Sequence, residues 1–175
     1  MGPLEIIVAS LRGLHLIALV SDFGTLIAIA MTPATQETAY LHRALRRIVR
    51  GGTACALVTG IAWLITESAV IADTDTIGNT LAAVPVVALQ TQYGQWFITR
   101  CILLLVLLAM PLSRRLGLIA ALLLGGAALA VQPMVGHAGA IGGNVGKELI
   151  ASETLHLLAA GAWLGGTARG YSSFG

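Results

Sequence analysis

The chain has 175 residues, of which 57% are hydrophobic and only 10% are charged, and its formal net charge is +2. A soluble domain averages about 25% charged residues, so these few charges could not cover a surface that faces water. The mean hydropathy of +0.87 likewise shows that apolar residues predominate. Composition therefore indicates an integral membrane protein with a single domain over residues 1–175. It excludes nucleic acid binding, because no basic stripe with interleaved aromatic residues is present.

Five apolar stretches are long enough to cross a bilayer as helices, which takes about 20 residues. Only helices suit such runs, because each backbone polar group must be satisfied within its own segment. The first stretch is expected to be a retained span and not a cleaved signal peptide, since Glu5 precedes the first arginine, Arg12. We therefore predict an all-α fold, a bundle of five transmembrane helices over about 6–31, 51–72, 96–112, 116–135 and 148–166.

The distribution of basic residues predicts the orientation of this bundle. Seven of them lie in the connections at 32–50 and 113–115 and in the tail after the last span, against two, Arg12 and Lys147, on the opposite side. By the positive-inside rule the N-terminus lies outside and the C-terminus inside. His42 falls in the long basic inner connection, where we expect it to be solvated or beside lipid headgroups.

The outer connection from Asp73 to Gln95 contains an apolar run, Leu81–Leu89, that is too short to span. We expect this run to lie on the membrane surface or to pack as a lid.

Several polar side chains are predicted at one level, near the outer membrane face. Depth was estimated at about 1.5 Å per residue along each helix. Such groups are costly in lipid and are expected to face one another inside the bundle. The expected cluster comprises His15, Met134, His137 and His156 as candidate metal ligands, supported by Glu67, Arg100 and Glu153, with Asp22 lying deeper, toward the midplane.

Three interpretations of this cluster remain open. Imidazole with thioether sulfur suits copper. Two imidazoles from different helices suit haem b iron instead, in which case Arg100 could hold a propionate. In the third interpretation these residues only hydrogen-bond between helices. No phosphate-binding loop, nucleophile elbow, zinc-protease motif or dinucleotide-binding fingerprint is present, so an enzyme is not expected.

Four segments together resemble the copper resistance protein D family of bacterial inner-membrane proteins. Residues Thr91–Arg100 (TQYGQWFITR) resemble its T-x-aromatic-G…W…R helix start, and Gly136–Ala138 (GHA) its G-H-A turn. Residues His156–Gly166 (HLLAAGAWLGG) resemble its H-x-x-A-x-x-x-W-x-G-G helix, which is the most specific part. Arg12–His15 is similar to the opening helix, so the resemblance extends from about Arg12 to Gly166.

This resemblance implies copper uptake or tolerance at the inner membrane, with His15, His137 and His156 toward the periplasm. The resemblance assigns no role to Met134 and Glu153, whose assignment to the cluster depends only on their estimated depth. Expected partners are membrane lipid, further copies or other membrane subunits, and a periplasmic copper-binding protein.

Members of that family usually continue with further spans, whereas this chain ends nine residues after Gly166. It is therefore expected to be a short or truncated form, or a subunit completed by another chain. A structural subunit of a larger membrane complex is accordingly a further functional alternative.

Overall fold

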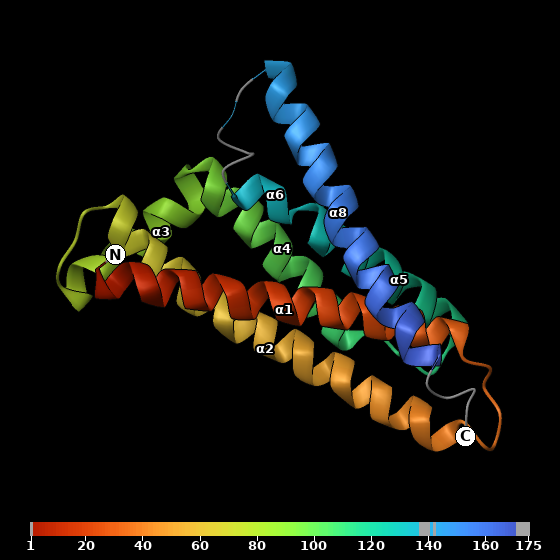
Figure 1. Ribbon diagram of the computed structural model, residues 1–175. Helices are drawn as coiled ribbons and strands as arrows, with labels where there is room; N and C mark the ends of the chain where they lie inside the picture. Colours follow the sequence, from red (N-terminus) through yellow and green to blue (C-terminus); the bar gives the residue numbers. More distant parts are fainter. Residues whose placement is uncertain (1, 137–140, 142, 171–175) are drawn as a thin grey trace.

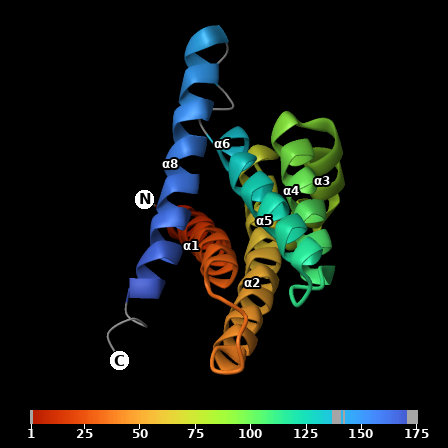
Figure 2. The ribbon, with the colours of Figure 1, turned by 90° about the vertical axis from the view of Figure 1, so that its right-hand side faces the viewer.

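The protein is described by a computed structural model, which covers residues 2–136, 141 and 143–170. Its helices, which confirm the predicted all-α fold, are α1 (Pro3–Met31), α2 (Ala39–Ile71), α3 (Ile77–Gln90), α4 (Gln92–Ala109), α5 (Arg115–Ala130), α6 (Gln132–Val135) and α8 (Gly143–Gly170). Helix α1 lies between α2 and α8 and also packs against α5 (Figures 1 and 2).

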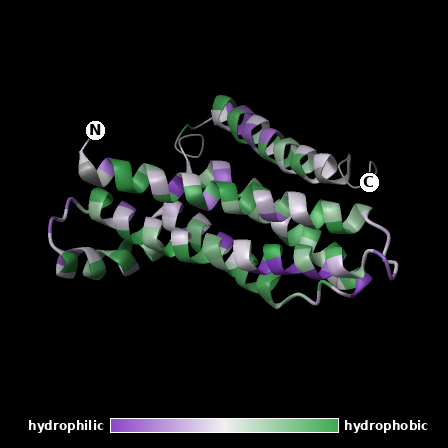
Figure 3. Ribbon diagram, turned by 60° about the horizontal axis from the view of Figure 1, so that its bottom comes forward, coloured by the Kyte–Doolittle hydropathy of each residue, from purple (hydrophilic) through white to green (hydrophobic). Residues whose placement is uncertain are grey.

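Four segments in the described part of the chain are helical, long and apolar enough to cross a membrane: Glu5–Met31, Ala39–Ile71, Gln92–Ala109 and Arg115–Val135. They correspond to the first four predicted spans. Large apolar side chains on their outer surfaces are exposed in the isolated chain, among them Val58, Ile102 and Leu123 at 67%, 54% and 70%. Hydrophobic residues extend along the helices (Figure 3). This is the surface that lipid covers in a multi-pass membrane protein.

The start of α2 corrects the sequence interpretation. The prediction placed a basic loop before residue 51, but the helix begins at Ala39. Arg43, Arg46, Arg47 and Arg50 therefore stand on its first turns. Between these arginines, Val49 packs inward and is only 1% exposed, whereas Ile48 faces outward and is 51% exposed. A helix can contain these arginines because an amphipathic helix carries its charge on one face while another face packs inward.

The predicted fifth span, 148–166, lies within α8 and is helical. Helix α8 is 28 residues long and packs mainly against α1, with further contacts to α5 and α6. It is not among the four helices that are apolar enough to count as span candidates. Lys147, Glu148 and Glu153 in its first half lower its hydropathy.

Helix α3 contains the apolar run predicted to lie on the surface or act as a lid. It packs against α2 and α4 (Figure 1). The Thr91 hydroxyl caps α4, accepting a hydrogen bond from the Gly94 amide at 3.0 Å. A Cβ at Gly94 would lie 2.2 Å from the Val87 carbonyl oxygen. Threonine and glycine in the TQYG sequence therefore make the tight junction between α3 and α4.

Candidate functional site

Two cavities of similar size meet at the end of the bundle where α1 begins. The first has a volume of about 390 Å³ and the second about 400 Å³. Arg12 of α1 and Gly136, which follows α6, line both cavities. The first is enclosed by α1, α2, α4 and α6, and the second by α1, α6 and α8. Each cavity thus contains only some members of the predicted polar cluster.

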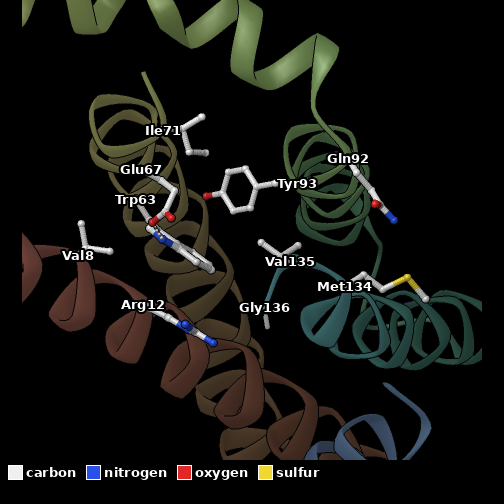
Figure 4. A pocket seen from close by; sticks show the side chains of 10 residues that line it. All are labelled: Val8, Arg12, Trp63, Glu67, Ile71, Gln92, Tyr93, Met134, Val135 and Gly136. Atoms are coloured by element: carbon white, nitrogen blue, oxygen red, sulfur yellow. Dashed lines mark hydrogen bonds between the residues drawn. The ribbon is translucent and has the colours of Figure 1, made fainter. Parts of the chain in front are cut away.

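The first cavity contains Glu67 and Met134 (Figure 4). The indole nitrogen of Trp63 donates a hydrogen bond to Glu67 Oε2 at 3.1 Å, one helical turn away on α2. Tyr93 of α4 turns its hydroxyl toward Glu67 (Figure 4). Met134 lies on the side of the cavity opposite Trp63. This cavity therefore offers a carboxylate, a phenol and a thioether.

The second cavity contains Glu153 and His156 of α8. These side chains are one turn apart and both are exposed. Leu16 and Gln132 line the same cavity, from α1 and α6. An imidazole and a carboxylate thus stand together where a ligand from solution can reach them.

His15 lies outside both cavities, in a buried aromatic layer, and is 1% exposed. Its ring lies 6.0 Å from Trp63 and 6.5 Å from Phe97, centroid to centroid. Its Nδ1 is 2.7 Å from the carbonyl oxygen of Ala56 on α2. Its Nε2 has no hydrogen-bond partner within the described residues. The position of His15 is therefore fixed, with one nitrogen left unused.

Arg100 is completely buried beside this layer. Its guanidinium carbon lies 4.9 Å from the centroid of Phe97 and 5.4 Å from that of Trp63. Its Nη1 donates a hydrogen bond to Gln132 Oε1 on α6. Cation–π contacts of this kind contribute about 0.5–2 kcal/mol each. In this arrangement Arg100 joins α4 to α6 and is not among the residues that line the two cavities.

Asp22 occupies a separate place deeper in the bundle, at 2% exposure. Its Oδ2 accepts a hydrogen bond from the Thr53 hydroxyl at 2.7 Å. Its Oδ1 has no partner in the described part of the chain. The close approach of Asp22 depends on Gly52, where a Cβ would lie 2.0 Å from Oδ1.

The predicted ligands are therefore distributed over different environments. Met134 lines one cavity, His156 lines the other, and His15 is buried in the aromatic layer. His137 lies outside the described residues. Among the residues that the structure describes, no three His, Cys, Asp or Glu side chains are grouped closely enough to hold one metal ion.

Sequence reasoning did not place Arg12, Tyr93, Gln132 and Thr53 in the site. Arg12 is a charged residue within the first predicted span, one turn before His15, and this could have identified it. Gln132 gave a similar signal, as a polar residue near the end of an apolar run. Thr53 gave none, since hydroxyl side chains in apolar helices usually bond to their own backbone.

The donor set fits copper better than haem. A thioether favours Cu(I), and imidazole accepts either oxidation state of copper. The bis-imidazole haem considered from the sequence would require two imidazoles aimed at one iron. Of the two described histidines near this end, His15 is sealed among aromatic rings and His156 is exposed on α8.

These helices and this polar region define a multi-pass helical membrane protein with charged and ligand-type side chains gathered at one end. Residues 3–147 match the family described as copper resistance protein D-like, N-terminal domain. The chain therefore belongs to that family. The HLLAAGAWLGG segment lies beyond the matched residues. Neither the curated proteins nor the solved structures gave a match.

Proposed function

We propose that this protein handles copper at the bacterial inner membrane, in copper uptake or tolerance, and binds the ion near the periplasmic face. Membership of the copper resistance family supports copper as the cargo. The proposed ligands are His15, His137, His156 and Met134. Glu67 and Glu153 would support them through negative charge, and Arg100 through its hydrogen bond to Gln132 on α6, the helix that carries Met134. No catalytic step is proposed.

The observation that carries this proposal is the meeting of the two cavities at Gly136. Met134 is two residues before Gly136, and His137 is the next residue in the chain. His156 reaches the second cavity from α8. Met134 and His156 thus place a thioether and an imidazole in two adjoining cavities, and such donors suit copper.

The proposed topology has five spans, with α8 as the fifth, the N-terminus in the periplasm and the C-terminus in the cytoplasm. Basic residues support it, because α2 and α5 begin at the same end of the bundle, where six arginines lie in their first turns or directly before them. Single cysteines introduced at Ser113 and Asn144, after replacement of Cys55 and Cys101 by alanine, test it. An impermeant maleimide applied to intact cells should label position 144 and not position 113. The reverse pattern would invert the topology.

Copper would arrive from a periplasmic copper-binding protein and pass inward toward Asp22. The depth of Asp22 motivates this route. Alanine at Asp22 should lower copper accumulation by cells, relative to cells that produce the same amount of unaltered protein. Unchanged accumulation would refute the route while leaving the outer binding site in place.

The first experiment is elemental analysis of copper and iron in the gently solubilised protein. We expect about one copper per chain, held by soft and imidazole donors. His156→Ala and Met134→Leu should each reduce the copper content. Met31→Leu, at the other end of α1, is the matched control and should not.

Two other outcomes of the elemental analysis would support the alternative functions. Iron near one atom per chain, with a Soret absorption band, would assign the histidines to haem b. Absence of both metals after copper loading, together with stable co-purification of other membrane chains, would favour a structural subunit of a larger complex.

A further inference from the structure

Two adjoining cavities form a cleft at the opposite end of the bundle, where α1 ends and α2 and α5 begin. Their volumes are about 590 Å³ and 300 Å³. Arg43, Arg46, Leu112 and Ser113 line both of them. Helix α2 forms one wall, and the connection from α4 to α5 forms the other. We call this the basic cleft.

The basic cleft is strongly positive and has no internal counter-charge. Six arginines line it: Arg43, Arg46, Arg47, Arg50, Arg114 and Arg115. Neither cavity has a carboxylate among its lining residues, as far as the structure describes the chain. These guanidinium groups make no hydrogen bond or ion pair with other described residues. Such a concentration of like charge favours an anion.

His42 supplies a second, independent indication of a ligand. It lines the basic cleft and is 7% exposed, which contradicts the first of its two predicted environments, solvent, and leaves the second, lipid headgroups, untested. Its Nε2 has no hydrogen-bond partner within the described residues. A buried polar atom without a partner is destabilising, and an anionic oxygen in the cleft would satisfy it.

The floor of the cleft is apolar. Ile29 and Leu112 form part of it, at 2% and 4% exposure. Leu116 of α5, next to Arg115, is 81% exposed, and Ile48 of α2 is 51% exposed. An occupant that matches these features has an anionic group for the arginines and hydrocarbon that continues along α2 and α5.

We propose that the basic cleft binds the phosphodiester headgroup of an anionic phospholipid. Guanidinium groups bind phosphate oxygens through paired hydrogen bonds. Basic pockets between transmembrane helices are suited to such headgroups. The lipid joins the start of α2 to the start of α5, and its acyl chains cover the exposed apolar faces of both helices. The site is independent of copper binding, because it uses none of the proposed ligands.

The test is native mass spectrometry of the full chain in neutral detergent. Binding is titrated with short-chain phosphatidylglycerol, short-chain phosphatidylcholine and glycerol phosphate. Phosphatidylglycerol should bind at least about tenfold more tightly than phosphatidylcholine, from the attraction of several arginines. Arg46→Gln should weaken its binding about fivefold. Lys147→Gln, at the other end of the bundle, is the matched control and should leave it unchanged.

A second variant separates charge from hydrogen-bond geometry. Arg43→Lys combined with Arg46→Lys keeps both charges but removes the paired donors. It should bind phosphatidylglycerol more weakly than the unaltered chain and more tightly than Arg43→Gln combined with Arg46→Gln. Equal affinity for the two lipids, or an equal effect of Lys147→Gln, would overturn the proposal. Glycerol phosphate binding as tightly as the lipid would assign the cleft to a soluble phosphate instead.

Discussion

The Nδ1 atom of His15 lies 2.7 Å from the carbonyl oxygen of Ala56, across the interface between α1 and α2. A carbonyl oxygen can only accept a hydrogen bond, so Nδ1 must carry the proton. In the neutral ring Nε2 is then the atom with the free lone pair. A backbone contact that fixes the tautomer in this way is common among histidines that bind metals. The position of His15 is thus consistent both with helix packing and with metal ligation.

His15→Gln and His15→Phe distinguish these two roles. Loss of the hydrogen bond to Ala56 should destabilise the protein by about 1 kcal/mol, and the phenylalanine variant should show this in its thermal unfolding midpoint. If Nε2 binds copper, both variants should also lose copper by elemental analysis. A folded glutamine variant that retains its full copper content would limit His15 to packing.

The adjacent glycines Gly51 and Gly52 provide a matched pair of substitutions on α2. A Cβ at Gly52 would lie 2.0 Å from Asp22 Oδ1, whereas nothing lies within 4 Å of a Cβ at Gly51. Gly52→Ala should therefore destabilise the protein by about 1–3 kcal/mol, because Asp22 is held by Thr53 and has little room to move. Gly51→Ala should be neutral or stabilising by up to about 1 kcal/mol, since alanine favours helix.

Thermal unfolding in detergent measures both glycine variants. Equal midpoints for the two would mean that Asp22 does not pack against α2 as described. Copper accumulation by cells that produce Gly52→Ala would also show whether displacement of Asp22 affects transport.

The sequence predicted the all-α class and the first four spans because each follows from a long apolar run. It missed the beginning of α2 because arginines at 43, 46, 47 and 50 suggested a loop. Their spacing leaves Val49 free to pack inward, and that is decided by tertiary contacts. For α8, helix formation was predictable, but its charged first half makes it less apolar than the other spans.

The site was predicted less completely than the fold. The depth of a residue along a helix follows from its number. The sequence could therefore predict that several polar side chains lie at one depth, near one end of the bundle. Which side chains meet depends on the rotation and tilt of each helix, which depth does not determine. His15 turns toward Ala56 and the ring of Phe97, while His156 on α8 faces a separate cavity. Met134 and Glu67 line one cavity, although they are distant in sequence.

The hydrogen bond between Arg100 and Gln132 gives a third prediction. Arg100→Lys keeps the charge but cannot reproduce the contacts of the guanidinium group with Phe97 and Trp63. It should destabilise the protein by about 1–3 kcal/mol, because Gln132 loses its buried partner. Lys147→Arg, at an exposed position, is the control and should have no effect on the unfolding midpoint.

Gln132→Ala, alone and combined with Arg100→Lys, completes a double-mutant cycle for this pair. The combined loss of stability should be smaller than the sum of the two separate losses, since both changes remove one hydrogen bond. Strictly additive losses would show that Arg100 is held by the aromatic rings alone.

The contact of α8 with α1 gives a fourth prediction, which also concerns the proposed fifth span. A Cβ at Gly165 would lie 2.3 Å from the carbonyl oxygen of Gly24 on α1, and one at Gly24 would lie 2.7 Å from that of Gly161. Small residues allow two helices to approach this closely within a membrane. At Gly166, the next residue, nothing lies within 4 Å of a Cβ.

Gly165→Ala should therefore separate α8 from α1, whereas Gly166→Ala should not. A short thiol cross-linker measures the separation by joining cysteines introduced at Ile27 and Leu164, whose side chains border this contact, in a chain in which Cys55 and Cys101 are alanine. Gly165→Ala should reduce the cross-linking yield several-fold and destabilise the protein by about 1–3 kcal/mol, the cost of overpacking a tight contact. Because His156 reaches the second cavity only while α8 lies against α1, the same variant should also lower the copper content. Full cross-linking with loss of copper would separate metal binding from this helix contact.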